Sequence, residues 1–246
     1  MVSDIIRSEA GLCHVTMAFN VFMDKIEREG MENFVGGVKM STTEVSIVLF
    51  ADDVMLLTER EEDMETNLRE LKKAMSNWGM KIHWGKTKVM VVSRQEEGCK
   101  VCVDGEEIEH VQNMKYLGAI QSADGTCEEE IEHRVGAAAR VIGAMRKEVL
   151  ERRKLKKATK MRVYNAMVIP TMLCGSETWT MTMMKRHKSR LRATEMAYLR
   201  RVVGVTRIDR VRNTDVRVAV RQEEVMEEVK RKTKSMKGEV GANGRW

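Results

Sequence analysis

Residues 45–57 read VSIVLFADDVMLL, and this stretch decides the fold of the first half of the chain. Residues 45–50 form one largely apolar run, and residues 54–57 form a second. Ala51, Asp52 and Asp53 separate the two runs. Short apolar runs joined by a tight acidic turn predict a β-hairpin with the aspartates at its apex.

The paired carboxylates are candidates for metal binding. At a turn, adjacent aspartates can share one exposed edge, and an apolar wall beside them favours a bound cation over uncompensated charge. Mg²⁺ takes one or two protein carboxylates and completes its shell with phosphates and water, and two such ions roughly 3.5–4 Å apart can promote phosphoryl transfer. The alternative is an ordinary acidic turn, because Asp is common in turns, and the dipeptide alone favours this alternative.

An amphipathic helix is predicted directly after the hairpin. Thr58 followed by Glu61 fits a capping box at its start. The helix should end at Gly79, because the apolar residues recur at alternating spacings of four and three up to that point: Met64, Leu68, Leu71, Met75 and Trp78.

Shorter elements surround this helix. The patterns predict a helix over 15–29 and strands over 88–93, 100–103, 106–108 and 116–120, with Asp104 and Gly105 forming a hairpin turn. The sequence therefore predicts an α+β region over residues 1–122.

The rest of the chain is predicted to be helical and basic. Thr126 and Glu129 fit a second capping box, which opens a long helix that extends to Val149. Further helices are expected over 154–169, where Pro170 should stop or kink the helix, over 182–203 and over 214–234, followed by a frayed tail. Residues 146–212 contain 19 Lys and Arg against 5 Asp and Glu. This imbalance favours a polyanionic partner over the alternative of solvated helix faces. We divide this part into residues 123–217 and a charged helix with its tail, residues 218–246.

Several motifs together resemble a known family. FADDVMLLTEREEDMETNLRELKKAMSNWGMKIHWGKTKVMVVS, residues 50–93, resembles the palm of reverse transcriptases from non-LTR (LINE-type) retrotransposons. MKYLGAI, residues 114–120, is similar to the Y-L-G turn of that family. Residues 160–182 and 192–213 resemble the thumb and the segment after it, so the resemblance covers about residues 19–217. It implies a partial polymerase palm, an antiparallel sheet packed on helices, followed by an all-helical basic thumb-like region.

The resemblance also implies roles for individual residues in RNA-directed DNA polymerisation. Asp52 and Asp53 would bind Mg²⁺, and Lys86, preferred here over Lys88, would approach the leaving phosphates of a deoxynucleotide. The 3′ end of the primer would lie against Tyr116, Leu117 and Gly118. The RNA template and DNA primer would be held by the basic block, including Arg152, Arg153, Lys156 and Lys157.

The chain departs from the family pattern at its start. The third catalytic carboxylate of the family comes from a strand upstream of the helix at 15–29, and the stretch before residue 15 is too short to hold that strand or the fingers. Residues 9–16, EAGLCHVT, keep only the glycine of the family's R-Q-G-C-x-x-S-P turn. We therefore expect a reverse transcriptase fragment that is inactive alone. The alternatives are a catalytically dead nucleic-acid-binding remnant or a translated relic without function.

Other features have simpler interpretations. Cys99 and Cys102 form a lone C-x-x-C with only His110 as a further nearby ligand, so ordinary thiols are favoured over a zinc site. Trp179 is expected to anchor packing rather than stack on a base. The sequence has neither a run of about 18 apolar residues nor a secretion signal, which leads us to expect an intracellular protein that does not bind membranes.

Overall fold

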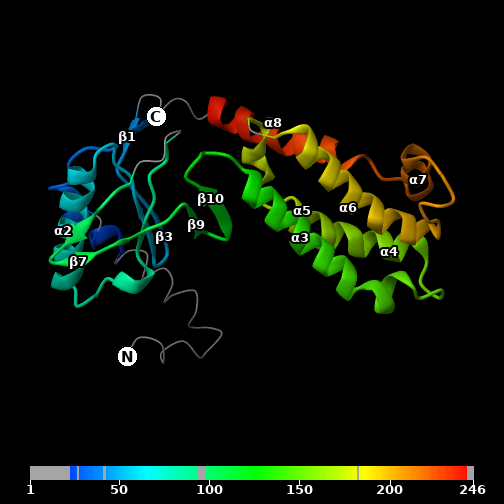
Figure 1. Cartoon of the computed structure of the whole chain (residues 1–246), viewed down its shortest axis with the longest axis horizontal. Helices are drawn as coiled ribbons and strands as arrows, with labels where there is room; N and C mark the ends of the chain where they lie inside the picture. The colour runs from blue at the N-terminus through cyan, green and yellow to red at the C-terminus, as the bar shows by residue number, and fades with distance from the viewer. Residues whose placement is uncertain (1–22, 27, 41–42, 94–97, 182, 243–246) are drawn as a thin grey trace. The chain divides into compact units, whose positions relative to one another are not determined.

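A computed structural model describes residues 23–26, 28–40, 43–93, 98–181 and 183–242, with backbone alone at 180–181 and 236–242. The chain divides into two compact units, Met1–Leu117 and Gly118–Trp246. Figure 1 shows the elements of each unit in chain order. The boundary lies at the Y-L-G motif, a few residues before the one that we drew at 122.

The first unit is built from one long helix and several two-stranded ladders. Residues 23–26 and 28–31 are helical, within and just beyond the predicted helix over 15–29, whose first part lies outside the described residues. The strands are β1 (Val38–Met40), β2 (Thr43–Val45), β3 (Ile47–Phe50), β4 (Asp53–Leu56), β5 (Lys88–Val89), β6 (Cys102–Val103), β7 (Glu106–Glu107), β8 (Glu109–His110) and β9 (Asn113–Tyr116), and the long helix is α2 (Glu61–Asn77).

The pairing of these strands differs from one continuous palm sheet. In the part of the unit that the structure describes, β1 pairs with β2, β3 with β4 and β6 with β7, all antiparallel. The predicted turn at Asp104 and Gly105 joins β6 to β7 and is confirmed. β5 pairs with β8 in parallel, so the predicted strand over 88–93 is reduced to two paired residues. The arrangement is a mixture of helix and strand, and the palm stays a prediction.

Helix α2 organises the core of this unit, because its apolar residues contact clusters on two sides. Leu71 and Ala74 pack with Met23 and Ile26 against the β3–β4 hairpin. Leu68 packs with residues of β5, β6 and the segment around Ile108. The predicted stripe is confirmed at its centre, whereas Trp78 is 38% exposed at the helix end.

Both predicted capping boxes are wrong. Arg60 is the N-cap of α2, and the Thr58 hydroxyl donates instead to the Arg60 carbonyl at 2.9 Å. Cys127 is the N-cap of α3 (Glu128–Ala144), and the Thr126 hydroxyl donates to the Asp124 carboxylate at 3.0 Å. In each case a local hydrogen bond of the threonine replaces the cap, which is a known competition for Ser and Thr side chains.

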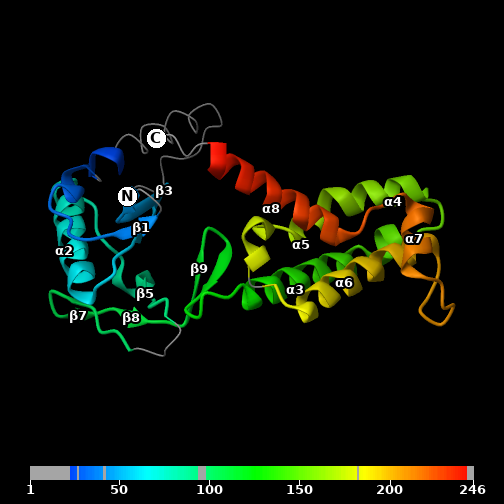
Figure 2. The ribbon, with the colours of Figure 1, turned by 90° about the horizontal axis from the view of Figure 1, so that it is seen from above.

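The second unit is helical after one short strand. It contains β10 (Ala119–Ser122), α3, the π-helical turn η2 (Arg146–Leu150), α4 (Lys157–Val163), the π-helical turn η3 (Tyr164–Val168), α5 (Ile169–Met172), the 3₁₀ segment η4 (Ser176–Met181), α6 (Lys185–Val203), α7 (Asn213–Val220) and α8 (Val225–Ala242). Helices α3 and α6 lie side by side in both views (Figures 1 and 2). Trp179 is fully buried in the core that these helices share, so its predicted packing role is confirmed.

Two of the predicted helices differ in the structure. The helix expected to stop or kink at Pro170 does not stop there but continues to Met172. The π-helical turn η3 directly precedes the proline, which lies in the first turn of α5. The charged helix expected over 214–234 is two helices, α7 and α8, separated at Arg221, whose φ is +55°. The segment expected to be frayed is helical as far as Ala242.

Among the described residues, no helix combines the length and apolar character needed to cross a membrane.

Candidate functional site

The β3–β4 hairpin places the two aspartates at its apex, as the sequence predicts. Phe50 is paired directly with Asp53, so the loop consists of Ala51 and Asp52 alone. Ala51 has φ of +52°, a conformation that suits glycine better than alanine at the first position of a tight hairpin loop. Some backbone strain is therefore located one residue from the carboxylates.

The two faces of the hairpin have different surroundings. Leu49 and Val54, which are directly paired, pack against the core cluster of α2. Directly paired residues of antiparallel strands share a face, so Asp53 lies on the opposite face with Phe50. Phe50 is 61% exposed and Val48 is 39% exposed, so the expected apolar wall exists but is open to solvent. Both aspartates are exposed as well.

Tyr116 is brought close to the hairpin. Burial, and then the charge of Asp53, raise the pKa of the Tyr116 phenol, which means that the two side chains interact electrostatically. The Tyr116 hydroxyl is buried and has no hydrogen-bond partner in the described part of the chain. The first unit therefore unites two residues that the resemblance assigned to the same active site.

The Y-L-G motif forms a turn. Leu117 and Gly118 have φ of +49° and +81°, as in the type I′ turns of two-residue hairpins. The strand predicted over 116–120 is therefore wrong, because the turn separates β9 from β10. Leu117 is exposed at the apex.

The two candidate lysines have different environments. Lys86 is exposed in the 3₁₀ turn η1 (Trp84–Lys86), without a described contact to Asp52 or Asp53. Lys88 forms an ion pair with Glu109 on the adjacent strand. Within the described residues, the side chains include no group of three or more His, Cys, Asp or Glu that could hold a metal ion. The hairpin itself presents two exposed carboxylates, those of Asp52 and Asp53.

The four basic residues that the sequence singled out lie in the loop between η2 and α4 and at the first residue of α4, together called the basic loop here. Arg152 and Arg153 follow η2, Lys156 caps α4 and Lys157 begins it, and all four are exposed. Arg152 forms an ion pair with Glu148 at 2.8 Å. For the other three, the described part of the chain shows no ion pair, so this basic loop carries uncompensated positive charge.

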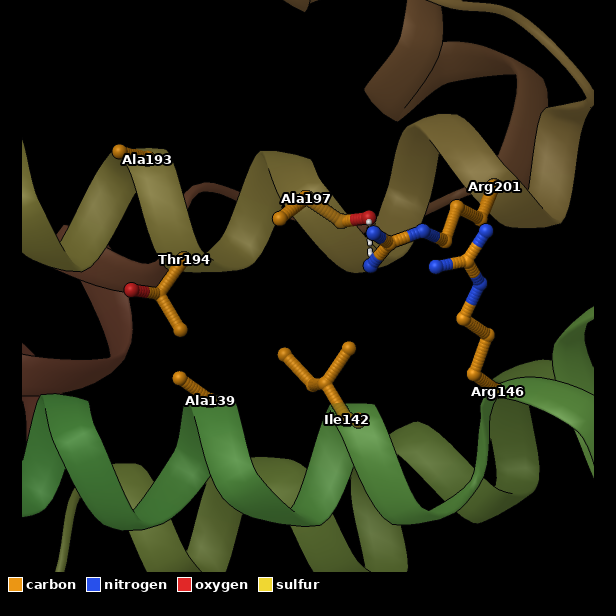
Figure 3. Close-up of a pocket in the computed structure, with 8 residues that line it drawn as sticks. Ala139, Ile142, Arg146, Ala193, Thr194, Ala197 and Arg201 are labelled. Carbon is orange, nitrogen blue, oxygen red and sulfur yellow. Dashed lines mark hydrogen bonds between the residues drawn. The ribbon is translucent and has the colours of Figure 1, made fainter.

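A groove between α3 and α6 adds two arginines that the sequence patterns did not single out. Its floor consists mainly of small residues, and Arg146 and Arg201 extend toward each other at one end (Figure 3). The lining residues are Ala139, Ile142, Gly143, Arg146, Ala193, Thr194, Ala197 and Arg201. The signal in the sequence is the pair of small-residue repeats at i and i+4, one on each helix.

The groove arginines are only partly neutralised. Arg146 forms an ion pair with Glu151 at 2.5 Å. Arg201 donates a long hydrogen bond of 3.4 Å to the Ala197 carbonyl, and no ion pair of its guanidinium is seen among the described residues. Two converging guanidinium groups suit a phosphate, which each can bind through two N–H donors.

Cys99 and Cys102 of the C-x-x-C segment are free thiols, and Cys99 is the less exposed of the two. Burial, together with the charges of Glu61 and Glu65, raises the pKa of Cys99 to about 11. A thiol with a raised pKa stays protonated at neutral pH, whereas a metal ligand must be a thiolate.

Comparisons with known proteins give similarities over much of the chain. Residues 10–120 match the family described as reverse transcriptase (RNA-dependent DNA polymerase). A transposon-derived protein of Caenorhabditis elegans is 27% identical over 209 residues, which cover 80% of this chain and 72% of that protein. The retrovirus-related Pol polyprotein of the type-1 retrotransposable element R2 of Nasonia vitripennis is 29% identical over 126 residues, or 47% of this chain and 12% of that polyprotein. The family match over residues 10–120 and the similarity to these two proteins together support a reverse transcriptase of the kind carried by non-LTR retrotransposons.

Proposed function

We propose that this chain contributes the metal-binding hairpin and a nucleic-acid-binding helical unit to RNA-directed DNA polymerisation. The observation that carries the proposal is the position of Asp52 and Asp53 at the apex of a two-residue hairpin in a segment that matches the reverse transcriptase family. Two exposed carboxylates fit Mg²⁺, which uses one or two protein carboxylates and otherwise binds water and substrate phosphates.

In this reaction the protein positions its substrates and stabilises charge. Mg²⁺, when bound, supplies positive charge to the reacting phosphate groups. Asp52 at the apex and Asp53 on the open face would hold the metal. Tyr116 would lie beside the Asp53 carboxylate, and the Leu117–Gly118 turn would contact the 3′ end of the primer. Lys86 would have to approach the nucleotide from η1 when substrate binds.

Primer extension tests the polymerase proposal. The full chain is incubated with an RNA template annealed to a DNA primer, deoxynucleotides and Mg²⁺. Extension that Asp52→Asn abolishes would support the polymerase role, whereas the sequence leads us to expect a fragment that is inactive alone. Glu59→Gln is the matched control, because Glu59 is an exposed acid close to the hairpin in sequence. Equal extension by the wild type and by Asp52→Asn would rule out the metal role of Asp52.

A second candidate function is nucleic-acid binding without catalysis. The basic loop around Arg152 and Lys156 and the converging arginines of the α3–α6 groove favour it. Salt-dependent binding of the same template–primer, with no extension under any divalent metal, would support this second function over the first.

The basic loop is tested by the salt dependence of binding. Substituting Arg152, Arg153, Lys156 and Lys157 by Gln should reduce the slope of log affinity against log salt by roughly one unit for each phosphate that the variant no longer binds. Lys185→Gln, at the start of α6, is the single-charge control. An unchanged slope in the fourfold variant would contradict a role for this loop.

A further inference from the structure

The connection between α6 and α7 is a loop held in one conformation by its own side chains. The Asp209 carboxylate accepts hydrogen bonds from the Thr206 amide at 2.6 Å and from the Thr206 hydroxyl at 2.8 Å. The Arg200 guanidinium donates to the Thr206 carbonyl at 3.1 Å and to the Val211 carbonyl at 2.8 Å. These bonds fix the two ends of the loop around residues 207–210.

The loop presents a bare apolar side chain at its tip. Ile208 is 88% exposed, although isoleucine is among the residues most often buried in proteins. Arg207 and Arg210 flank it, both exposed and without an ion pair in the described part of the chain. The one acid of the tip, Asp209, is already engaged with Thr206 and does not neutralise them.

This tip continues the basic groove between α3 and α6. A second hollow shares Ala197 and Arg201 with that groove and extends to Arg207. A nucleic-acid backbone whose phosphates contact Arg146 and Arg201 could therefore follow one continuous surface to the residues beside Ile208. The charge of this surface favours a polyanion over an apolar protein partner.

We propose that Ile208 is a wedge that inserts between adjacent bases of a nucleic-acid duplex bound along this surface. Proteins that unstack a base step use an apolar side chain held between Arg or Lys contacts to the backbone. Here Arg207 and Arg210 supply the backbone contacts, and the bonds of Arg200 and Asp209 hold the wedge rigid. The inference rests on the proposed nucleic-acid binding and adds to it a site, a residue and a mode of contact.

Fluorescence of 2-aminopurine tests the wedge without any need for activity. The probe base is placed at successive positions of an RNA–DNA hybrid and of a DNA duplex, and the full chain is added at low salt. We expect a rise in fluorescence at one or two adjacent positions, because unstacking relieves the quenching of the probe. Ile208→Ser should lose most of that rise while it keeps most of the affinity.

Matched variants separate the possible outcomes. Val218→Ser removes another apolar side chain, 76% exposed on α7, and should leave the fluorescence rise unchanged. Arg207→Gln with Arg210→Gln should weaken binding and lower the salt slope by about two units, whereas Lys185→Gln should lower it less.

The result that overturns the wedge is binding of the duplex with no rise at any probe position, or an equal rise with Ile208→Ser. Failure of the wild-type chain to bind either duplex at low salt would instead overturn the proposed nucleic-acid function, and the wedge with it. Because Ile208 is exposed, its substitution should leave the thermal unfolding midpoint unchanged, which checks that the variant is folded.

Discussion

At the scale of single residues, Asn67 shows how a polar group can hold the first unit together. It is fully buried in α2, and its side chain accepts from the Val35 amide at 2.8 Å and donates to the Val35 carbonyl at 2.9 Å. The asparagine thereby pairs with both backbone groups of Val35, much as a neighbouring strand would. Helical periodicity could not predict this contact, because it places polar residues of a helix on the solvent side.

We predict that Asn67→Ala lowers the free energy of unfolding by about 1–2 kcal/mol. Both backbone groups of Val35 lose their hydrogen-bond partner, and water replaces it only in part because Val35 is partly covered. Asn33→Ala is the control, since Asn33 makes an exposed contact with Glu70 and should cost less than about 0.5 kcal/mol. Urea unfolding followed by tryptophan fluorescence measures both values. Equal losses for the two variants would contradict the role of Asn67.

Glu195 should give the second unit an unusual dependence on pH. It is fully buried and forms an ion pair with Arg217 at 2.6 Å. Burial raises the pKa of its carboxyl, an effect that the Arg217 hydrogen bond and charge only partly offset. The folded state therefore holds a proton at pH values where the unfolded state has lost it, so this residue favours folding as pH falls toward the ordinary value of 4.5.

We predict that the wild type gains stability relative to Glu195→Gln as pH falls from neutrality to about 4.5, and loses that gain as pH rises through the raised pKa. The Gln variant leaves Arg217 without its charge partner at every pH, and this loss lowers the free energy of unfolding by the same amount throughout. The informative quantity is therefore how the difference in unfolding free energy between the two proteins changes with pH. Urea unfolding of both proteins at several pH values measures it. A difference that does not change with pH would show that Glu195 has an ordinary pKa.

At the scale of elements, α2 controls the chemistry of the strand that packs beside it. Glu61 accepts a hydrogen bond from the Lys100 amide, and Glu65 accepts one from the Cys102 amide at 2.9 Å. These acids occupy backbone donors along an edge that pairs with no strand in the described part of the chain, and the same charges help to raise the pKa of Cys99. One helix face thus protects a strand edge and keeps a thiol protonated.

We predict that Glu61→Gln speeds the alkylation of Cys99 by iodoacetamide at pH 8 by roughly several-fold, because the thiolate fraction rises as the pKa falls. The gain is limited, since burial is the largest cause of the raised pKa and is unaffected. Mass spectrometry of the modified peptides gives the rate, with the exposed Cys102 as an internal reference. A Cys99 rate that stays constant would mean that Glu61 has no effect on the thiol.

The elements also show what the sequence could predict. Local periodicity predicted the β3–β4 hairpin and the centre of α2. The predicted hairpin also placed the two candidate metal-binding aspartates at its apex. The continuation of the helix past Pro170 could not be predicted from local sequence, because the π-helical turn before it depends on the packing of the whole unit. Arg201 and Ile208 were missed as site residues, since their meaning depends on which helices and loops become neighbours in space.

At the scale of the whole molecule, each unit has a core of its own. The core of the second unit draws on every helix from α3 to α8. The first residues of this unit are hydrogen-bonded to α3. The Glu130 carboxylate accepts from the Ile120 amide at 2.8 Å, and Arg134 donates to the Gly118 carbonyl at 2.7 Å. The basic loop, the α3–α6 groove and the Ile208 tip all belong to this unit.

We therefore predict that residues 118–246, produced alone, unfold cooperatively and bind an RNA–DNA hybrid with the same salt slope as the full chain, within about one unit. Circular dichroism during thermal unfolding tests the fold, and titration at several salt concentrations tests binding. The control is the same fragment with Gln at Arg152, Arg153, Lys156 and Lys157, which should fold equally well and bind with a smaller slope. If the fragment unfolds without a cooperative transition, its core requires the first unit of the chain. If the fragment folds but its salt slope is smaller than that of the full chain by more than about one, residues 1–117 supply phosphate contacts of their own.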